Sequence, residues 1–406
     1  MRLFKEKRKA VLGGFIMATY IPFVNTLSDC LRLKLYPDAT KLRVSLETIN
    51  TLGKKLPKKL PLWIDPAIDG YHYLLISKDR SENWKQYIKQ FKNSQILSNS
   101  SFLRKPETEK LKQFVTSILD KCSKFKSDWI TVPQLPIIDG TSRNKINRAL
   151  AAATSEWKLN SGFNGKFILP IIFTHQEQLK GKTEWRKKLT VAKTCYRDSG
   201  ALGIWAVDSS LSDQKGSGKY DKRFQSLIEF HKDLQQDFPD GMIIAGPYWG
   251  MNLILWARGL CDYPAISLGT AYQYYISGGF PRPPKTRLAI PPLRRWAVAE
   301  RPLKTWLDDV LEQIDPSDTE YKQFLYLRDN FSILSIQETA RDQVAKFYRK
   351  WIDKLEDTPA PGRALALYQD LSSAYILGKQ LKELPRKEAP GQAPEKVAQQ
   401  FMLNCL

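Results

Sequence analysis

Cysteine and histidine are scarce in this sequence of 406 residues, and neither forms a recognisable ligand motif. The cysteines show no CxxC or CxC spacing, so neither a disulfide framework nor a structural zinc site of the usual pattern is indicated. The three histidines give little support to a histidine-based triad or metal centre. We therefore predict no metal or other cofactor, and the sparse cysteines fit a reducing cytoplasm. The five cysteines are Cys30, Cys122, Cys195, Cys261 and Cys405.

Long apolar runs and common nucleotide-binding motifs are also missing. No stretch approaches the roughly 20 apolar residues of a membrane span, so no membrane-embedded segment is predicted. No GxGxxG follows the first strand-like segment, and no C2H2 zinc finger, RNP motif or basic zipper is present. The segment DQKGSGKYDKRF at 213–224 lacks the GxxxxGK[ST] spacing of a phosphate loop, and we interpret it as a basic lid.

Positive charge is what the sequence has in excess. Lys and Arg number 63 against 42 Asp and Glu, which gives a net charge of +21. An excess of this size attracts polyanions, so nucleic acid is the leading partner class and an anionic membrane surface the second. Residues 1–16 are basic and are interpreted as an N-terminal extension, with Met1 or Met17 as the start.

Short apolar strand patterns alternate with amphipathic helical patterns along most of the chain. Continuous apolar strands separated by such helices predict a parallel sheet covered by helices, and eight units favour a closed (β/α)8 barrel over residues 17–293. The expected strands are 18–24, 41–49, 60–65, 128–137, 166–174, 202–208, 241–249, 263–270 and 286–291. The expected helices between them are 81–94, 106–125, 142–158, 183–198, 220–237 and 250–260.

The remainder of the chain has a different pattern. A proline-dense segment at 278–296 marks a boundary, and residues 294–384 then show only helical spacing of apolar side chains. We predict a C-terminal helical region there, followed by a polar tail over 385–406.

In a (β/α)8 barrel the working residues lie where the strands end, because the following loops converge on the barrel mouth. Two aspartates there can divide the roles of general acid and of base or nucleophile. Aspartate at a strand end also commonly caps a helix or forms an Asx turn, so both interpretations stay open. The candidates are Asp65 and Asp69, Gln134, His175, Asp208, Gly246, Tyr248, Asp262 and Tyr272.

Asp65 is the strongest single candidate. It ends the apolar run LPLWID and is followed at once by Pro66, which is unlike a routine helix cap. Asp69 precedes Gly70 and is more typical of a turn. Tyr272 lies in a segment that combines tyrosines, glycines and basic residues, a mixture suited to stacking on bases.

The segments LWIDPAIDGY, LGIWAVDSS and MIIAGPYWGMNLILWARGLCDYPAISLGT resemble, in order and spacing, the tRNA-guanine transglycosylase family and its DNA-modifying relatives that handle 7-deazaguanine bases. The resemblance covers roughly residues 60–280. It departs from the family in that DPAIDGY stands where the family has a DSGGFQ-type turn, and the CxCxxC and histidine zinc site is absent.

This resemblance implies a (β/α)8 barrel enzyme that exchanges guanine for a 7-deazaguanine base in DNA or tRNA. Asp262 falls near the family's nucleophilic aspartate and would attack the sugar C1′ carbon, while Asp65 would hold the base edge or handle protons. The other candidates would bind substrate, and protein partners in a modification system are compatible with such a role. Two alternatives remain open: a barrel that binds nucleic acid without catalysis, and a metal-dependent phosphoester hydrolase.

Overall fold

Eight parallel strands form a closed barrel in the computed structural model, and the strands pair in sequence order with β1 closing against β8. This closed barrel confirms the predicted (β/α)8 fold. The structure describes residues 19–57, 60–68, 89–94, 107–136, 141–174, 176–209, 211, 217–248, 250–268, 285–385 and 393–406. The barrel strands are β1 (Ile21–Val24), β2 (Leu42–Ser45), β3 (Leu62–Asp65), β4 (Trp129–Thr131), β5 (Lys166–Phe173), β6 (Gly203–Asp208), β7 (Met242–Ala245) and β8 (Tyr263–Ser267).

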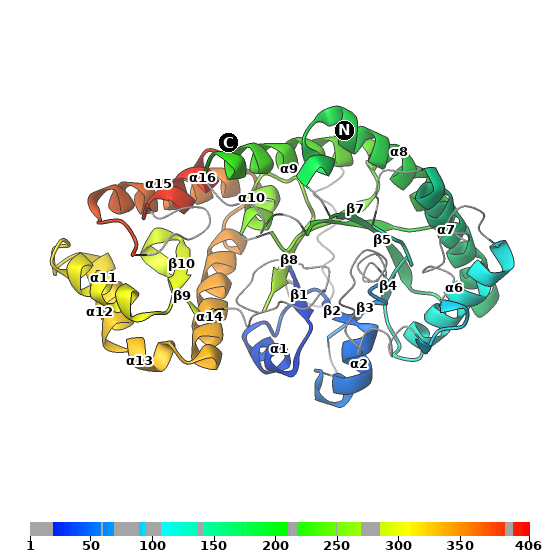
Figure 1. Ribbon diagram of the computed structural model, residues 1–406, viewed down its shortest axis with the longest axis horizontal. Coiled ribbons are helices and arrows are strands. Elements are labelled where there is room, and N and C mark those ends of the chain that lie inside the picture. Colours follow the sequence, from blue (N-terminus) through cyan, green and yellow to red (C-terminus); the bar gives the residue numbers. More distant parts are fainter. Residues whose placement is uncertain are drawn as a thin grey trace.

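Helices surround this barrel, as Figure 1 shows. The amphipathic helices bury their apolar side on the outer surface of the sheet. The helices of the barrel are α1 (Leu27–Arg32), α2 (Leu46–Leu52), α6 (Thr108–Ser123), α7 (Thr141–Ser161), α8 (Lys182–Ser199), α9 (Ser217–Asp237) and α10 (Met251–Ala257). Short 3-10 turns are η2 (Leu33–Leu35), η3 (Gly53–Lys55) and η5 (Gln176–Leu179).

The segment 41–49, expected to be one strand, is extended only in its first half. The pattern at 41–49 predicted continuous extended structure, but the chain turns into α2 after Ser45. The Ser45 side chain accepts a hydrogen bond from the backbone N–H of Thr48 and so caps the new helix. Apolar residues continue across this boundary, which is why periodicity alone did not reveal it.

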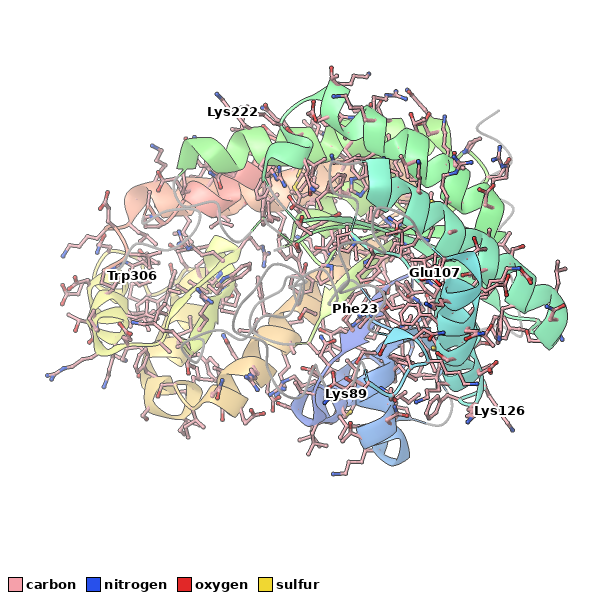
Figure 2. The ribbon with its side chains drawn as sticks, turned by 45° about the vertical axis from the view of Figure 1, so that its right-hand side comes forward. Phe23, Lys89, Glu107, Lys126, Lys222 and Trp306 are labelled. Atoms are coloured by element: carbon pink, nitrogen blue, oxygen red, sulfur yellow. The ribbon has the colours of Figure 1, made fainter. Side chains whose placement is uncertain are left out.

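Aromatic side chains fill the middle of the barrel. Phe23, Trp63 and Trp205 meet edge to face, with ring centroids 5.5–5.6 Å apart. Phe23 lies at the centre of the molecule in Figure 2. Because side chains alternate between the two sides of a strand, these contacts also place Arg43 and Asp65 on the interior side of β2 and β3.

The outer ring is completed from the C-terminal part of the chain. Helix α14 (Gln337–Glu356) lies between α1 and α10, beside β1 and β8 (Figure 1). The Tyr348 hydroxyl donates to Asn252 of α10 over 3.0 Å, and the Tyr36 hydroxyl donates to the carbonyl of Ala345 over 2.9 Å. The expected helical region 294–384 thus contributes a helix to the barrel itself.

A second, smaller core lies beside the barrel. It contains the antiparallel pair β9 (Arg287–Ile290) and β10 (Arg295–Val298), so 286–291 is a strand outside the barrel. Trp306, on the left in Figure 2, belongs to this core. The helices of this region are α11 (Arg301–Leu311), α12 (Thr319–Asp329), α13 (Phe331–Leu334) and α15 (Arg363–Gln380), with 3-10 turns η7 (Pro291–Leu293) and η8 (Ala360–Gly362).

The end of the chain is packed rather than a polar tail. Helix α16 (Lys396–Met402) buries Val397, Ala398 and Phe401 in the main core, although polar residues surround them in the sequence. The segment 385–406, expected to be a polar tail, thus contains a packed helix, because Val397, Ala398 and Phe401 share one side of it, whereas Leu403 is exposed. No helix in the described part of the chain is both long and apolar enough to span a membrane.

Candidate active site at the barrel mouth

Asp65 is the last residue of β3 and only 1% exposed. Its carboxylate accepts a hydrogen bond from the backbone N–H of Ala67 over 2.9 Å and forms an ion pair with Arg43. Burying a carboxylate without a partner is costly, so the arginine accounts for its presence inside the barrel. The structure places Asp65 where the sequence predicted it, at the C-terminal end of a barrel strand.

Arg43, which the sequence analysis did not single out, lies on β2 and is equally buried. Its guanidinium stands 4.7 Å from the centroid of the Phe23 ring and 5.4 Å from that of Trp205. One terminal nitrogen contacts Asp65 and the other donates to Asn25 over 2.9 Å. Cation–π contacts and the ion pair together fix the guanidinium in one orientation.

A small pocket of about 10 Å³ lies beside Asp65. This volume has room for about one water molecule, far less than the roughly 300–1,000 Å³ of sites that enclose a drug-sized ligand. The indole N–H of Trp63 donates to Thr131, which orients that hydroxyl in the pocket wall. The pocket is lined by Asp65, Pro66, Ile68, Thr131, Val132, Gln134, Pro170, Ile172 and Trp205.

Gln134 lines the same pocket and also secures the chain after β4. Its amide nitrogen donates to the carbonyls of Pro133 and Asn147, over 3.0 and 2.9 Å. Asn147 in turn exchanges two hydrogen bonds with the backbone of Leu135. Gln134 is therefore held rigidly near Asp65, by contacts that tie the β4 loop to α7.

Asp208 and Tyr248 lie together in a different place, between the barrel and α9. Asp208 accepts from Nε of Arg223 over 2.6 Å, and the Tyr248 hydroxyl donates to the carbonyl of Ala206 over 2.7 Å. Burial, with the nearby Asp208 charge, raises the pKa of Tyr248 well above its usual value. Since Trp205 faces the interior, alternation along β6 directs Asp208 outward, away from Asp65.

Gly246 follows β7 with a φ of +87°, a conformation that favours glycine. A Cβ atom added there would lie 2.9 Å from the backbone nitrogen of Tyr248. Its carbonyl accepts the indole N–H of Trp205 over 2.8 Å. Gly246 therefore positions Trp205, which is part of the pocket wall.

Asp262 lies at the opposite end of the barrel from Asp65, because it directly precedes β8. Its carboxylate accepts from the backbone N–H of Ile243 over 2.8 Å. Asp128, before β4, contacts Leu62 of β3 in the same way. The five-residue β8 spans about 16 Å at about 3.3 Å per residue, so the structure does not bring Asp65 and Asp262 together.

Three further candidates, Asp69, His175 and Tyr272, lie outside the described residues. Residues 1–16, expected to be a basic extension, also lie outside them, as do residues 213–216 of the expected lid. Residues 217–224 of that segment are not a lid but the first turns of α9. Among the described residues, no group of three or more His, Cys, Asp or Glu side chains is arranged to hold a metal ion.

Exposed basic side chains occur near the first turns of the helices that start at the mouth. They include Lys145 and Arg148 on α7, Lys182 on α8 and Lys222 on α9. Lys222 projects from the outer surface at the top of Figure 2. Helix starts lie at the C-terminal end of the strands in this fold, so these residues lie toward the same end of the barrel as Asp65.

A scan against known protein families finds no match, and no curated protein matches this sequence. Among solved structures, the carboxyl transferase domain of Rhizobium etli pyruvate carboxylase, determined with pyruvate, is similar at a TM-score of 0.36 and 11% identity. The match covers 95% of this chain and 62% of that chain. A similarity this weak identifies neither a family nor a function.

Proposed function

We propose that this chain is a nucleic-acid base-exchange enzyme of the transglycosylase type, with Asp65 as its reacting carboxylate. The observation that carries the proposal is the position of Asp65: a buried, ion-paired carboxylate in the wall of a small pocket at the C-terminal end of the barrel strands. The resemblance over residues 60–280 supports the reaction type, and the net charge of +21 supports a polyanionic substrate.

In the proposed reaction, an Asp65 oxygen bonds to the sugar C1′ carbon while the bond from C1′ to the base nitrogen breaks. The departing base takes the bonding electron pair and a proton from water. The nitrogen of the incoming 7-deazaguanine base then bonds to C1′ and loses its proton to the hydroxide so formed, while the bond from C1′ to the Asp65 oxygen breaks and releases the carboxylate. Asp262 has no part in this scheme because it lies at the other end of the barrel.

Reaching a base requires a single strand or extrusion from a duplex. The basic side chains around the mouth would offset that cost through phosphate contacts. Either DNA or tRNA satisfies this requirement.

Replacing Asp65 tests the proposal directly. Asp65→Asn should lower exchange of labelled guanine by roughly 10³-fold or more, since the amide cannot form the ester intermediate. Nucleic-acid binding should persist. The matched control is Asp208→Asn, which alters the other buried Asp–Arg pair outside the pocket and should retain exchange. Exchange at the wild-type rate in Asp65→Asn would exclude this carboxylate as the nucleophile.

One observation favours a second candidate, a barrel that binds nucleic acid without catalysis. Both Asp65 oxygens already contact protein groups, the N–H of Ala67 and the guanidinium of Arg43. This candidate predicts tight binding without base exchange in the wild-type chain, and binding unchanged by Asp65→Asn.

A further inference from the structure

Asn25 is the first residue after β1 and lies exposed at the rim of the barrel mouth. Its backbone is fixed by neighbouring helices. The N–H donates to Asp29 over 2.9 Å, and the carbonyl accepts from the Thr48 hydroxyl over 3.3 Å. An exposed side chain is thus held on a rigid support at the mouth.

The orientation of the Asn25 amide is set by Arg43. A guanidinium has donors only, so the amide must turn its oxygen toward Arg43, and the two groups lie 2.9 Å apart. The NH2 group then lies on the other side of the amide. Within the described parts of the chain, this nitrogen donates no hydrogen bond.

The same guanidinium holds Asp65 through its other terminal nitrogen. One arginine therefore positions two groups of opposite hydrogen-bonding character at the mouth. These are the amide donor of Asn25 and the carboxylate of Asp65, which only accepts. A ligand group that carries an oxygen acceptor complements the Asn25 donor. In a nucleoside, the 2′-hydroxyl of a ribose and the carbonyl of an oxopurine both supply such an oxygen.

We propose that Asn25 is a ligand-contacting residue that determines specificity, donating from Nδ2 to an oxygen acceptor of the nucleoside. The proposal rests on the proposed function only in taking a nucleoside as the ligand. Arg43 is the positioning residue for this contact, and two oxygens of a nucleoside could receive it, one on the ribose and one on the base.

Binding of three nucleosides to the full chain by titration calorimetry tests this assignment and separates the two sources. Guanosine carries both oxygens, 2′-deoxyguanosine lacks the hydroxyl, and adenosine lacks the base carbonyl. The wild-type chain should bind guanosine roughly tenfold more tightly than the analogue that lacks the relevant oxygen. Asn25→Ala should abolish that preference. The control Asn50→Ala, an exposed asparagine on α2, should keep it.

Asn25→Asp distinguishes a contact from a folding defect, because aspartate keeps the size and the Arg43 partner but offers only acceptors. If the base carbonyl is the partner, this variant should prefer adenosine, whose amino group donates. If the sugar hydroxyl is the partner, the variant should still prefer guanosine over 2′-deoxyguanosine, because a hydroxyl also donates.

The proposal is overturned if the wild-type chain binds none of the three nucleosides or binds them equally, or if Asn25→Ala discriminates as the wild type does. The guanine-exchange assay is a separate measurement. A chain that exchanges no base but discriminates nucleosides through Asn25 would refute the proposed function and leave this assignment standing.

Discussion

His231 is fully buried on α9, and its burial lowers the stability of the folded protein at acidic pH. Its Nδ1 lies 2.8 Å from the carbonyl of Leu227, and Nε2 has no hydrogen-bond partner among the described residues. Burial lowers the pKa of His231 to about 4, although the Leu227 contact raises it slightly. Below its ordinary pKa of about 6.5, the unfolded chain binds a proton that the folded chain does not.

Stability should therefore fall as the pH drops from about 6.5 to about 4, with no further contribution from His231 below that. The full effect is roughly 3 kcal/mol. His231→Leu should remove this part of the pH dependence while remaining folded at pH 8. Urea unfolding of both proteins from pH 8 to 4 measures the difference, and parallel curves would show that His231 does not titrate in this window.

Also at the scale of single residues, the sequence predicted Asp65 as a candidate site residue but did not predict its ion pair with Arg43. Asp65 stood out because a carboxylate ended an apolar strand directly before Pro66. Arg43 lies within an apolar strand as well, and a charged residue on an interior position requires a buried partner. The sequence therefore indicated that Arg43 has a buried partner. Identifying Asp65 as that partner requires the register of β2 against β3, which no local pattern supplies. Asn25 carries no sequence signal of its own.

At the scale of elements, α16 is a structural part of the barrel's outer layer. Phe401 contacts Phe224 of α9 and Trp351 of α14, with ring centroids 5.7 and 6.4 Å apart. It also approaches Gly250, whose φ of +90° and small size admit the ring: an added Cβ would lie 3.1 Å from it. The short helix therefore joins two helices from distant parts of the chain.

Phe401→Ala should destabilise the protein by about 3–5 kcal/mol, the usual cost of removing a buried phenyl ring. The control Leu403→Ala changes a side chain that is 64% exposed and should alter stability by less than about 0.5 kcal/mol. Chemical denaturation measures both. Equal stabilities for the two variants would mean that α16 does not pack as described.

Most strands and long helices were predictable because their apolar periodicity is strong. Short elements were not. Helix α16 has only a few apolar residues in a polar segment, and α2 continues an apolar run without a break. What these elements pack against is decided by contacts far away in sequence, and a local pattern does not contain that information.

At the scale of the whole molecule, the charge excess has a measurable consequence. If nucleic acid approaches the mouth, its affinity should fall about tenfold or more between 50 and 200 mM salt, because bound phosphates release counterions. Replacing Lys145 and Arg148 with alanine should weaken binding and reduce the slope of log K against log salt by up to about two.

The matched control for this prediction lies at the other end of the barrel. Lys124, after α6, and Lys166, the first residue of β5, are also exposed. Their double replacement by alanine removes the same charge and should leave the slope unchanged. Fluorescence anisotropy with a labelled oligonucleotide measures both, and equal effects of the two pairs would place the binding surface elsewhere than the mouth.

The late position of α14 in the chain bears on how the protein is made. All eight strands have left the ribosome once Ser267 has emerged, but the helix that covers the seam between β1 and β8 begins only at Gln337. Until then a nascent barrel has an uncovered apolar strip at its closure point, which is a site for self-association or for chaperone binding. Translation that stops before α14 should therefore yield an aggregation-prone chain, even though every strand of the barrel is present.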